Sequence, residues 1–309
     1  MADWPLIAVR FALYADLGLA FGWPLFWLYA LNRQERSDAG QSLLAIPLIF
    51  SGVAGLILSA LGFGLMVAAM GGTGLWNMDP SLLSAVLHEA PVGMALQLRM
   101  AALAMVAAAG LLALRFPSAG LKVAAGGGAV ALASLAWNGH AAATEGKLGA
   151  VHLASDFLHL WAAGLWIGAL FALLSLVAGR STDPVRMKVA HRALEKFSHI
   201  GTATVLVLIV TGIVNGTMIL GFFDPRVLVG TPYGQLLLLK LALFALMLGL
   251  AAANRFRLTP GLAAVLTDNG SPGRAAARLR LSIGLETTAA LAILALVGWL
   301  GTLEPGIAS

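Results

Sequence analysis

The chain has 309 residues, of which 60% are hydrophobic and 11% charged, and its mean hydropathy is +0.89. A soluble domain of this length could not bury that much apolar surface, so the composition excludes a water-soluble fold and indicates a polytopic membrane protein. Its net charge of +5 comes from bases spread over short loops, which predicts the lipid bilayer and not nucleic acid as its partner. The absence of cysteine leaves histidine, methionine and carboxylates as the ligands for any soft metal ion.

Apolar windows of about 20 residues predict the transmembrane helices. We therefore expect an all-α integral membrane protein, a bundle of about eight helices in a single domain over 1–309, with possible halves 1–139 and 140–309. Glycines at close spacing, such as Gly52 and Gly55, are typical of helices that pack closely in lipid. The predicted spans lie near residues 6–31, 43–70, 91–115, 121–139, 151–179, 195–221, 234–255 and 281–303.

The loops differ strongly in basic residues. Those after the first, third, fifth and seventh spans hold 14 Lys and Arg, whereas those after the second, fourth and sixth hold 2, Lys147 and Arg226. Because cytoplasmic loops collect Lys and Arg, this asymmetry predicts that both termini are periplasmic.

The outer loop between the second and third spans contains possible metal ligands. A short amphipathic helix is expected from Ser81 to Glu89, with Pro80 in its first turn. His88 and Glu89 end this helix and are candidate ligands at the outer face.

The stretch 138–168 contains three of the six histidines, His140, His152 and His159, together with Asp156. At 100° per residue, His152, Asp156 and His159 fall within a sector of about 60° on one helix. A polar stripe on an apolar helix should face the bundle interior or a water-filled cavity. His152 and His159 are about 10 Å apart along the helix, too far to share one ion, so an outer site and a deeper station are expected. Each histidine has the alternative of a hydrogen-bonded contact between helices.

Weaker candidates lie on the later spans. Thr211, Asn215 and Met218 form a second stripe, in which Met218 is a possible Cu(I) ligand or a packing residue. Toward the inner face, His199 and Glu286 form a possible exit station for a proton or ion, or a structural pair.

Other charged residues lie within the predicted spans. We expect Arg10 and Lys240 to extend to the outer interface.

At these residues the chain resembles the copper resistance protein D family of bacterial inner-membrane proteins, most densely from Gly139 to Pro260. The similarity rests on the order and spacing of several fragments. They are Gly-His-Ala at 139–141, Val-His-Leu-Ala-Ser-Asp-Phe-Leu-His-Leu-Trp-Ala-Ala-Gly-Leu-Trp-Ile-Gly at 151–168, Lys-Phe-Ser-His-Ile-Gly at 196–201, Thr-Gly-Ile-Val-Asn at 211–215, Gly-Thr-Pro-Tyr-Gly-Gln-Leu-Leu-Leu-Leu-Lys at 230–240 and Ala-Ala-Asn-Arg-Phe-Arg-Leu-Thr-Pro at 252–260.

The resemblance implies a CopD-like core at about 139–303 and a role in copper uptake from the periplasm toward the cytoplasm. It also implies a separate periplasmic donor of the copper resistance C type. Copper would reach an outer site of His140, His152 and Asp156, with His88 or Glu89, and pass to His159, with Met218 as a possible helper. Imidazole ligands suit Cu(I) and Cu(II) alike. No catalytic residues are expected.

Two other functions remain open from the residues alone. A b-type haem protein in electron transfer or haem-linked oxidation would use paired histidines as axial ligands, such as His140 with His152 or His159. A sensor or assembly partner would bind copper without moving it.

Overall fold

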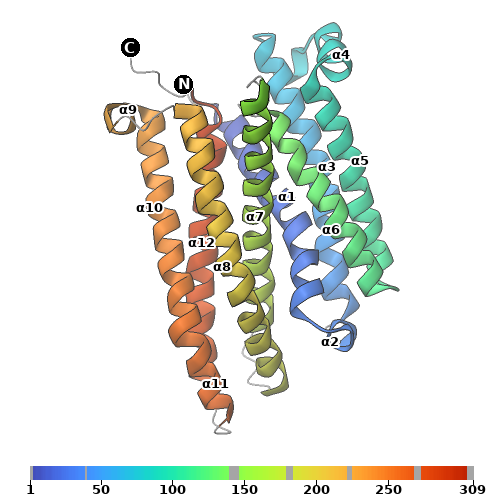
Figure 1. The fold of residues 1–309 in the computed structure, drawn as a ribbon. Helices are drawn as coiled ribbons and strands as arrows, with labels where there is room; N and C mark the ends of the chain where they lie inside the picture. The colour runs from blue at the N-terminus through green and yellow to red at the C-terminus, as the bar shows by residue number, and fades with distance from the viewer. Residues whose placement is uncertain are drawn as a thin grey trace.

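The computed structural model describes residues 3–38, 40–138, 146–178, 184–220, 225–267 and 273–304. These residues form helices and their connections, with no strand among them (Figure 1). Within this part of the chain, eight segments are long and apolar enough to cross a membrane, which confirms the predicted all-α bundle. The long helices are α1 (Trp4–Ala30), α3 (Gln41–Met70), α5 (Pro91–Ala113), α6 (Pro117–Ala133), α7 (Gly146–Val177), α8 (Pro184–Leu220), α10 (Pro232–Ala253) and α12 (Gly273–Leu300).

Short elements join the spans. The 3₁₀ turn η2 (Ser134–Asn138) extends α6, and the π turn η4 (Asn254–Leu258) joins α10 to α11 (Thr259–Thr267). The remaining short elements lie between spans: α2 (Arg33–Asp38), η1 (Leu75–Asn77), α4 (Pro80–Glu89) and α9 (Pro225–Gly230).

The predicted outer helix is present as α4. Asp79 caps it by accepting hydrogen bonds from the backbone N–H and the hydroxyl of Ser81, both at 2.8 Å, and Pro80 occupies its first turn. The same hydrogen bonds hold the pKa of the Asp79 carboxyl below its usual range.

Three helices are longer than predicted at the end of the bundle that contains α2 and α11, and one of them is α12, which begins at Gly273 where the pattern begins it near 281. The structure begins α8 at Pro184 where the hydropathy pattern begins it near 195, and it continues α10 through η4 and α11 to Thr267 where the pattern ends near 255. Hydropathy windows detect only the lipid-facing part of a helix, whereas a polar extension in water keeps the same backbone hydrogen bonds.

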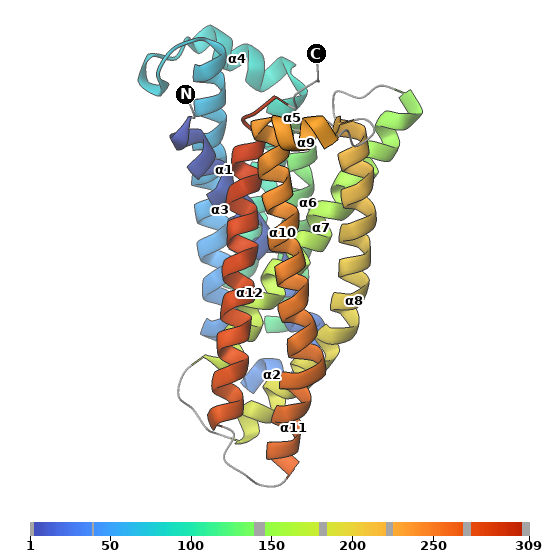
Figure 2. The same ribbon diagram turned by 90° about the vertical axis from the view of Figure 1, so that its left-hand side faces the viewer.

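The bundle is organised around α1 and α7, which lie in the middle of the view (Figure 1). The helices α3, α5 and α6 pack together on one side of this pair, and α8, α10 and α12 lie on the other. The rings of Trp4 and Trp299 lie 5.5 Å apart, so α1 begins where α12 ends. Helices α4 and α9 also lie at this end, and α2 and α11 lie at the opposite end (Figure 2).

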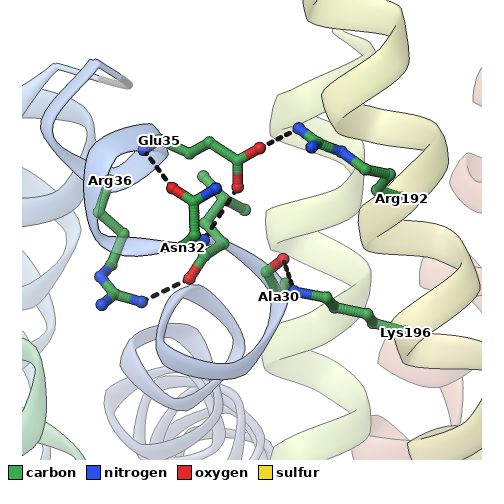
Figure 3. Close-up of polar contacts among 7 residues, drawn as sticks. Ala30, Asn32, Glu35, Arg36, Arg192 and Lys196 are labelled. Carbon is green, nitrogen blue, oxygen red and sulfur yellow. Dashed lines mark hydrogen bonds and ion pairs between the residues drawn. The ribbon is translucent and has the colours of Figure 1, made fainter.

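Polar contacts at the α2 end join α1, α2 and α8 (Figure 3). Asn32 and Glu35 form a capping box, because each side chain accepts a hydrogen bond from the other's backbone N–H, at 2.8 and 2.9 Å. The other carboxylate oxygen of Glu35, Oε1, pairs with Arg192 of α8, and Lys196 donates to the carbonyl of Ala30 at 3.2 Å. Arg192 and Lys196 therefore hold α8 against α2 and against the C-terminal end of α1.

Helices α1 and α7 approach each other through glycines. A Cβ added at Gly22 would lie 2.0 Å from the carbonyl oxygen of Gly164, and one added at Gly168 would lie 2.1 Å from the carbonyl carbon of Gly22. No side chain fits there, so these glycines permit direct contact between two backbones.

This contact gives a stability prediction. Gly22→Ala should lower the melting temperature of the detergent-purified protein by about 3–10 °C, because overpacking costs about 1–3 kcal/mol. The matched control is Gly249→Ala, since a Cβ at Gly249 of α10 meets nothing within 4 Å. Thermal unfolding followed by circular dichroism should show the control unchanged or slightly stabilised. Equal melting temperatures for the two variants would remove the α1–α7 contact as the reason for glycine at position 22.

Candidate functional site between α1, α7, α8, α10 and α12

The polar stripe of α7 faces a cavity of about 270 Å³ between α1, α7, α8, α10 and α12. His152, Asp156, His159 and Ala163 all line it, as the helical spacing predicts. Other helices contribute further polar side chains, which are Arg10 and Tyr14 from α1, Asn215 from α8, and Tyr233 and Lys240 from α10. The cavity lies in the half of the bundle that contains the start of α1 and the end of α12, because Arg10, Leu300 and Gly301 also line it.

His159 is held by Thr211 of α8. Its Nδ1 lies 2.8 Å from Oγ1 of Thr211, and this hydroxyl lies 2.6 Å from the backbone carbonyl of Val207. A hydroxyl has one proton, and the short contact to a carbonyl uses it, so Thr211 accepts the second hydrogen bond from Nδ1–H of His159. The imidazole therefore carries its proton on Nδ1, and Nε2 keeps a lone pair that can bind a metal ion.

Asp156 is oriented by Asn215, whose Nδ2 donates to Oδ1 of the carboxylate at 3.2 Å. One residue earlier on α7, the hydroxyl of Ser155 donates to the carbonyl of Thr211 at 3.3 Å. Helices α7 and α8 are thus linked by three polar contacts over about one turn of each helix, which fix the rotation of the α7 stripe relative to α8. Asn215 was predicted to share a stripe with Thr211, and both residues contact the α7 stripe.

His152 lies deeper in protein than its position near the start of α7 suggests, with 2% of its surface exposed. It is about 10 Å from His159 along the helix axis, so the two imidazoles line one cavity at different depths. Among the described residues, no group of three His, Asp or Glu side chains is close enough to enclose a metal ion. The described part of the site can therefore offer one or two protein ligands at each depth.

The charges of the cavity are unequal. Arg10 and Lys240 bring two positive charges to it, and Asp156 brings one negative charge. The expectation that Lys240 extends to the outer interface is wrong, because it lines the cavity, whereas the guanidinium of Arg10 lies next to Gly301, at the end of α12. A charged group in a membrane span is stabilised by a polar cavity and a counter-charge; Lys240 lines this cavity, and Asp156 brings the negative charge to it.

The other candidate ligands lie elsewhere. His140 is outside the described residues. His88 and Glu89 are exposed at the end of α4, which packs against α3 and α5, and neither lines the cavity. Met218 is half-buried on α8 one residue from the cavity-lining Ile219, but it does not line the cavity.

The structure does not bring the inner pair together. Glu286 is 2% exposed and accepts hydrogen bonds from Nε1 of Trp166 at 3.1 Å and from Nδ2 of Asn254 at 2.9 Å. His199 is exposed on α8 and does not line the cavity that contains Glu286. The interpretation of His199 as the partner of Glu286 is therefore wrong, because Asn254 and Trp166 occupy that place.

The arrangement needed for a haem between two helices is also not present among the described residues. The described histidines that line the cavity, His152 and His159, come from the same helix and not from facing helices. Bis-histidine ligation needs one imidazole on each side of the iron.

This cavity, called the outer cavity because it lies at the end predicted to be periplasmic, is followed by two more toward the other end of the bundle. A second, mostly apolar cavity of about 340 Å³ shares His159, Ala163 and Lys240 with it and reaches Trp166. A third cavity of about 310 Å³ begins at Trp166 and contains Glu286. The α7 stripe thus runs past three neighbouring cavities, and sequence reasoning missed the second and third because their other walls come from α8, α10 and α12.

The chain matches two protein-family models. Residues 1–150 match the copper resistance protein D-like N-terminal domain, and residues 191–300 match copper resistance protein D. No solved structure matches the chain.

Three curated proteins are similar to it. Copper resistance protein D of Pseudomonas syringae pv. tomato is 41% identical over 309 residues, which cover 99% of this chain and 98% of the relative. Inner membrane protein YebZ of Escherichia coli (strain K12) is 30% identical over 306 residues, which cover 97% and 98%. Copper transport protein CutJ of Bacillus subtilis (strain 168) is 37% identical over 123 residues, which cover 40% of this chain and 22% of the relative.

Proposed function

Because this chain belongs to the copper resistance protein D family, we propose that it binds copper and mediates copper uptake from the periplasm toward the cytoplasm. Its eight apolar spans and its similarity to an inner membrane protein make it a multi-pass protein of the bacterial inner membrane. The names of its relatives describe copper resistance and copper transport, and the proposed role is transport and not catalysis.

The observation that carries this proposal is the state of His159. Its Nδ1–H is bound by Thr211, which leaves the lone pair of Nε2 unused by that contact, and His159 lines the cavity. Metal-binding histidines characteristically donate their second N–H in this way, which fixes the tautomer and the direction of the ring. Imidazole nitrogen suits copper in either oxidation state.

The proposed route has two stations on α7. Copper first meets an outer site of His140, His152 and Asp156. It then passes to His159, which lies about one turn of α7 beyond Asp156 and about two turns beyond His152. His88 and Glu89, exposed at the α4 end, would serve as separate surface ligands, and Met218 would assist beside the cavity as a thioether. We propose a separate periplasmic copper-binding protein of the copper resistance C type as the donor at this end.

We further propose that the α4 and α9 end of the bundle is periplasmic, together with both termini, and that the whole chain is one transmembrane domain. Support comes from the basic residues at the opposite end, such as Arg33 on α2, Arg192 on α8 and Arg255 on η4, because cytoplasmic segments collect Lys and Arg. The chain has no cysteine, so single introduced thiols can test this.

In spheroplasts, a membrane-impermeant maleimide should label Trp76→Cys at the α4 end, where Trp76 is 93% exposed. Arg33→Cys, exposed on α2, should be labelled only after the membrane is permeabilised. The reason is that the reagent reaches only thiols on the outer side of the membrane. The reverse labelling pattern would show that the termini are cytoplasmic.

Copper binding to the detergent-purified protein should depend on the α7 stripe. His152→Ala and Asp156→Ala should each weaken binding far more than His191→Ala, a histidine at the other end that pairs with Glu195 at 3.6 Å. Thr211→Val should weaken binding by about 10–100-fold, because it removes the acceptor that orients His159, and Thr211→Ser should restore it. The measurements are copper stoichiometry and affinity, with anaerobic Cu(I) and aerobic Cu(II) in parallel.

In the same series, His159→Ala should impair copper accumulation in cells while some surface binding remains. Equal losses in the His152, Asp156 and His191 variants would contradict the site, and unchanged accumulation in His159→Ala would remove His159 from the route.

Lys240 should oppose copper binding, because it brings a positive charge into the cavity that receives the metal cation. Lys240→Gln should therefore raise copper affinity on the order of tenfold, since removing a nearby like charge is worth about 1–2 kcal/mol at an intermediate dielectric. Lys188→Gln removes the same charge from an exposed position on α8 and is the matched control. A loss of affinity in Lys240→Gln would mean that the lysine organises Asp156 for binding and does not compete with copper.

A further inference from the structure

The inner cavity around Glu286 is chemically different from the outer one. It measures about 310 Å³ and is enclosed by α7, α8, the end of α10 with η4 and α11, and α12. Among the described residues that line it, the charged ones are Glu286 and Arg255, and none is a histidine or methionine. Its polar atoms are oxygen and nitrogen atoms of carboxylate, amide, hydroxyl and guanidinium groups, which suit a hard cation or a proton and not Cu(I).

Glu286 is a buried carboxylate whose described hydrogen-bond donors are neutral. Its two oxygens accept from the indole of Trp166 and the amide of Asn254. The cation that shares the cavity, Arg255, bonds instead to the backbone carbonyl of Ser198 at 3.1 Å and to the hydroxyl of Thr202. A carboxylate at 2% exposure without a paired cation is costly in a membrane, and binding a proton removes that cost.

Asn254 is suited to both protonation states of Glu286. It is 7% exposed, its Nδ2 donates to the carboxylate, and its Oδ1 is buried without a hydrogen-bond partner among the described residues. If the amide turns by half a rotation, Oδ1 can accept a hydrogen bond from a protonated Glu286. An amide side chain can therefore partner the carboxylate and the carboxylic acid, whereas a Lys or Arg partner could serve only the carboxylate.

The π turn η4 gives this group its position. Consecutive residues at its start point to different helices, because Asn254 contacts Glu286 of α12 and Arg255 contacts Ser198 and Thr202 of α8. Such widened turns inside α-helices occur frequently at functional sites. They allow a side chain to reach a direction that a regular helix does not offer.

We propose that Glu286 is a proton-binding site at the inner end of the copper route, with Asn254 serving both of its forms. This inference rests on the proposed uptake function in one respect: the ionised carboxylate of Glu286 attracts the copper cation toward the inner end of the route, and a proton that binds Glu286 removes that negative charge and favours release of the cation. The step forms one O–H bond on the carboxylate and changes no oxidation state.

Infrared difference spectra of the purified protein, taken without copper while the pH is varied, test the proton site directly. The carbonyl-stretch region of protonated carboxylic acids should contain a component that titrates, that is lost in Glu286→Gln, and that remains in Glu195→Gln, an exposed glutamate of α8. In Asn254→Leu this component should persist but titrate about one pH unit or more higher, because the hydrogen bond lost by the charged form is stronger than the one lost by the neutral form.

The Asn254 variant also keeps the test decisive if Glu286→Gln fails to fold. A component unchanged in Asn254→Leu, or identical spectra for Glu286→Gln and Glu195→Gln, would overturn the proton site.

Copper uptake into proteoliposomes separates this inference from the proposed function. Uptake by the wild type should depend on the internal pH, and this dependence should be lost in Glu286→Gln and kept in Glu195→Gln. If copper uptake by the wild type does not change with internal pH, proton-driven release is overturned while the uptake function remains intact. No uptake by the wild type, together with the expected infrared result, would overturn the uptake function and leave the proton site standing.

Discussion

The backbone contact between α1 and α7 determines how the rest of the bundle is arranged. Gly22, Gly164 and Gly168 leave no room for a side chain between the two helices, so one face of α7 is committed to α1. Gly164 and Gly168 lie about 120–160° around the helix from His152. With that face occupied, the polar stripe of α7 turns toward the space between α1, α8, α10 and α12, where the cavity forms.

Burial of charge in the membrane explains where the remaining polar groups lie. Each charged side chain in a span needs water, a hydrogen-bond partner or a counter-charge, because lipid offers none of them. Asp156, Lys240 and Arg10 meet this need in the outer cavity, and Glu286 meets it with Asn254 and Trp166 in the inner one. Among the described residues that line the outer and inner cavities, the imidazoles belong to the outer one, so the two ends of the proposed route present different ligands to a cation.

Much of the fold could be predicted because its signals are local. A span of apolar residues is visible in the chain itself, and so is the capped helix α4, with Asp79 and Pro80 at its start. The inner extension of α8 could not be predicted from hydropathy, because its residues are polar and are held by contacts such as Arg192 with Glu35 of α2. The position of Lys240 could not be predicted for a similar reason: its surroundings depend on helices distant in the chain.

The sequence by itself determined the number of spans and the common face of His152, Asp156 and His159, since helix periodicity depends only on spacing along one segment. Only the tertiary structure decided what that face meets. Thr211 sets the tautomer of His159, Asn215 orients Asp156, and Asn254 takes the place beside Glu286 that His199 was expected to fill. These partners are 32 to 59 residues apart in the chain, and their meeting depends on how whole helices rotate and pack, which no local pattern encodes.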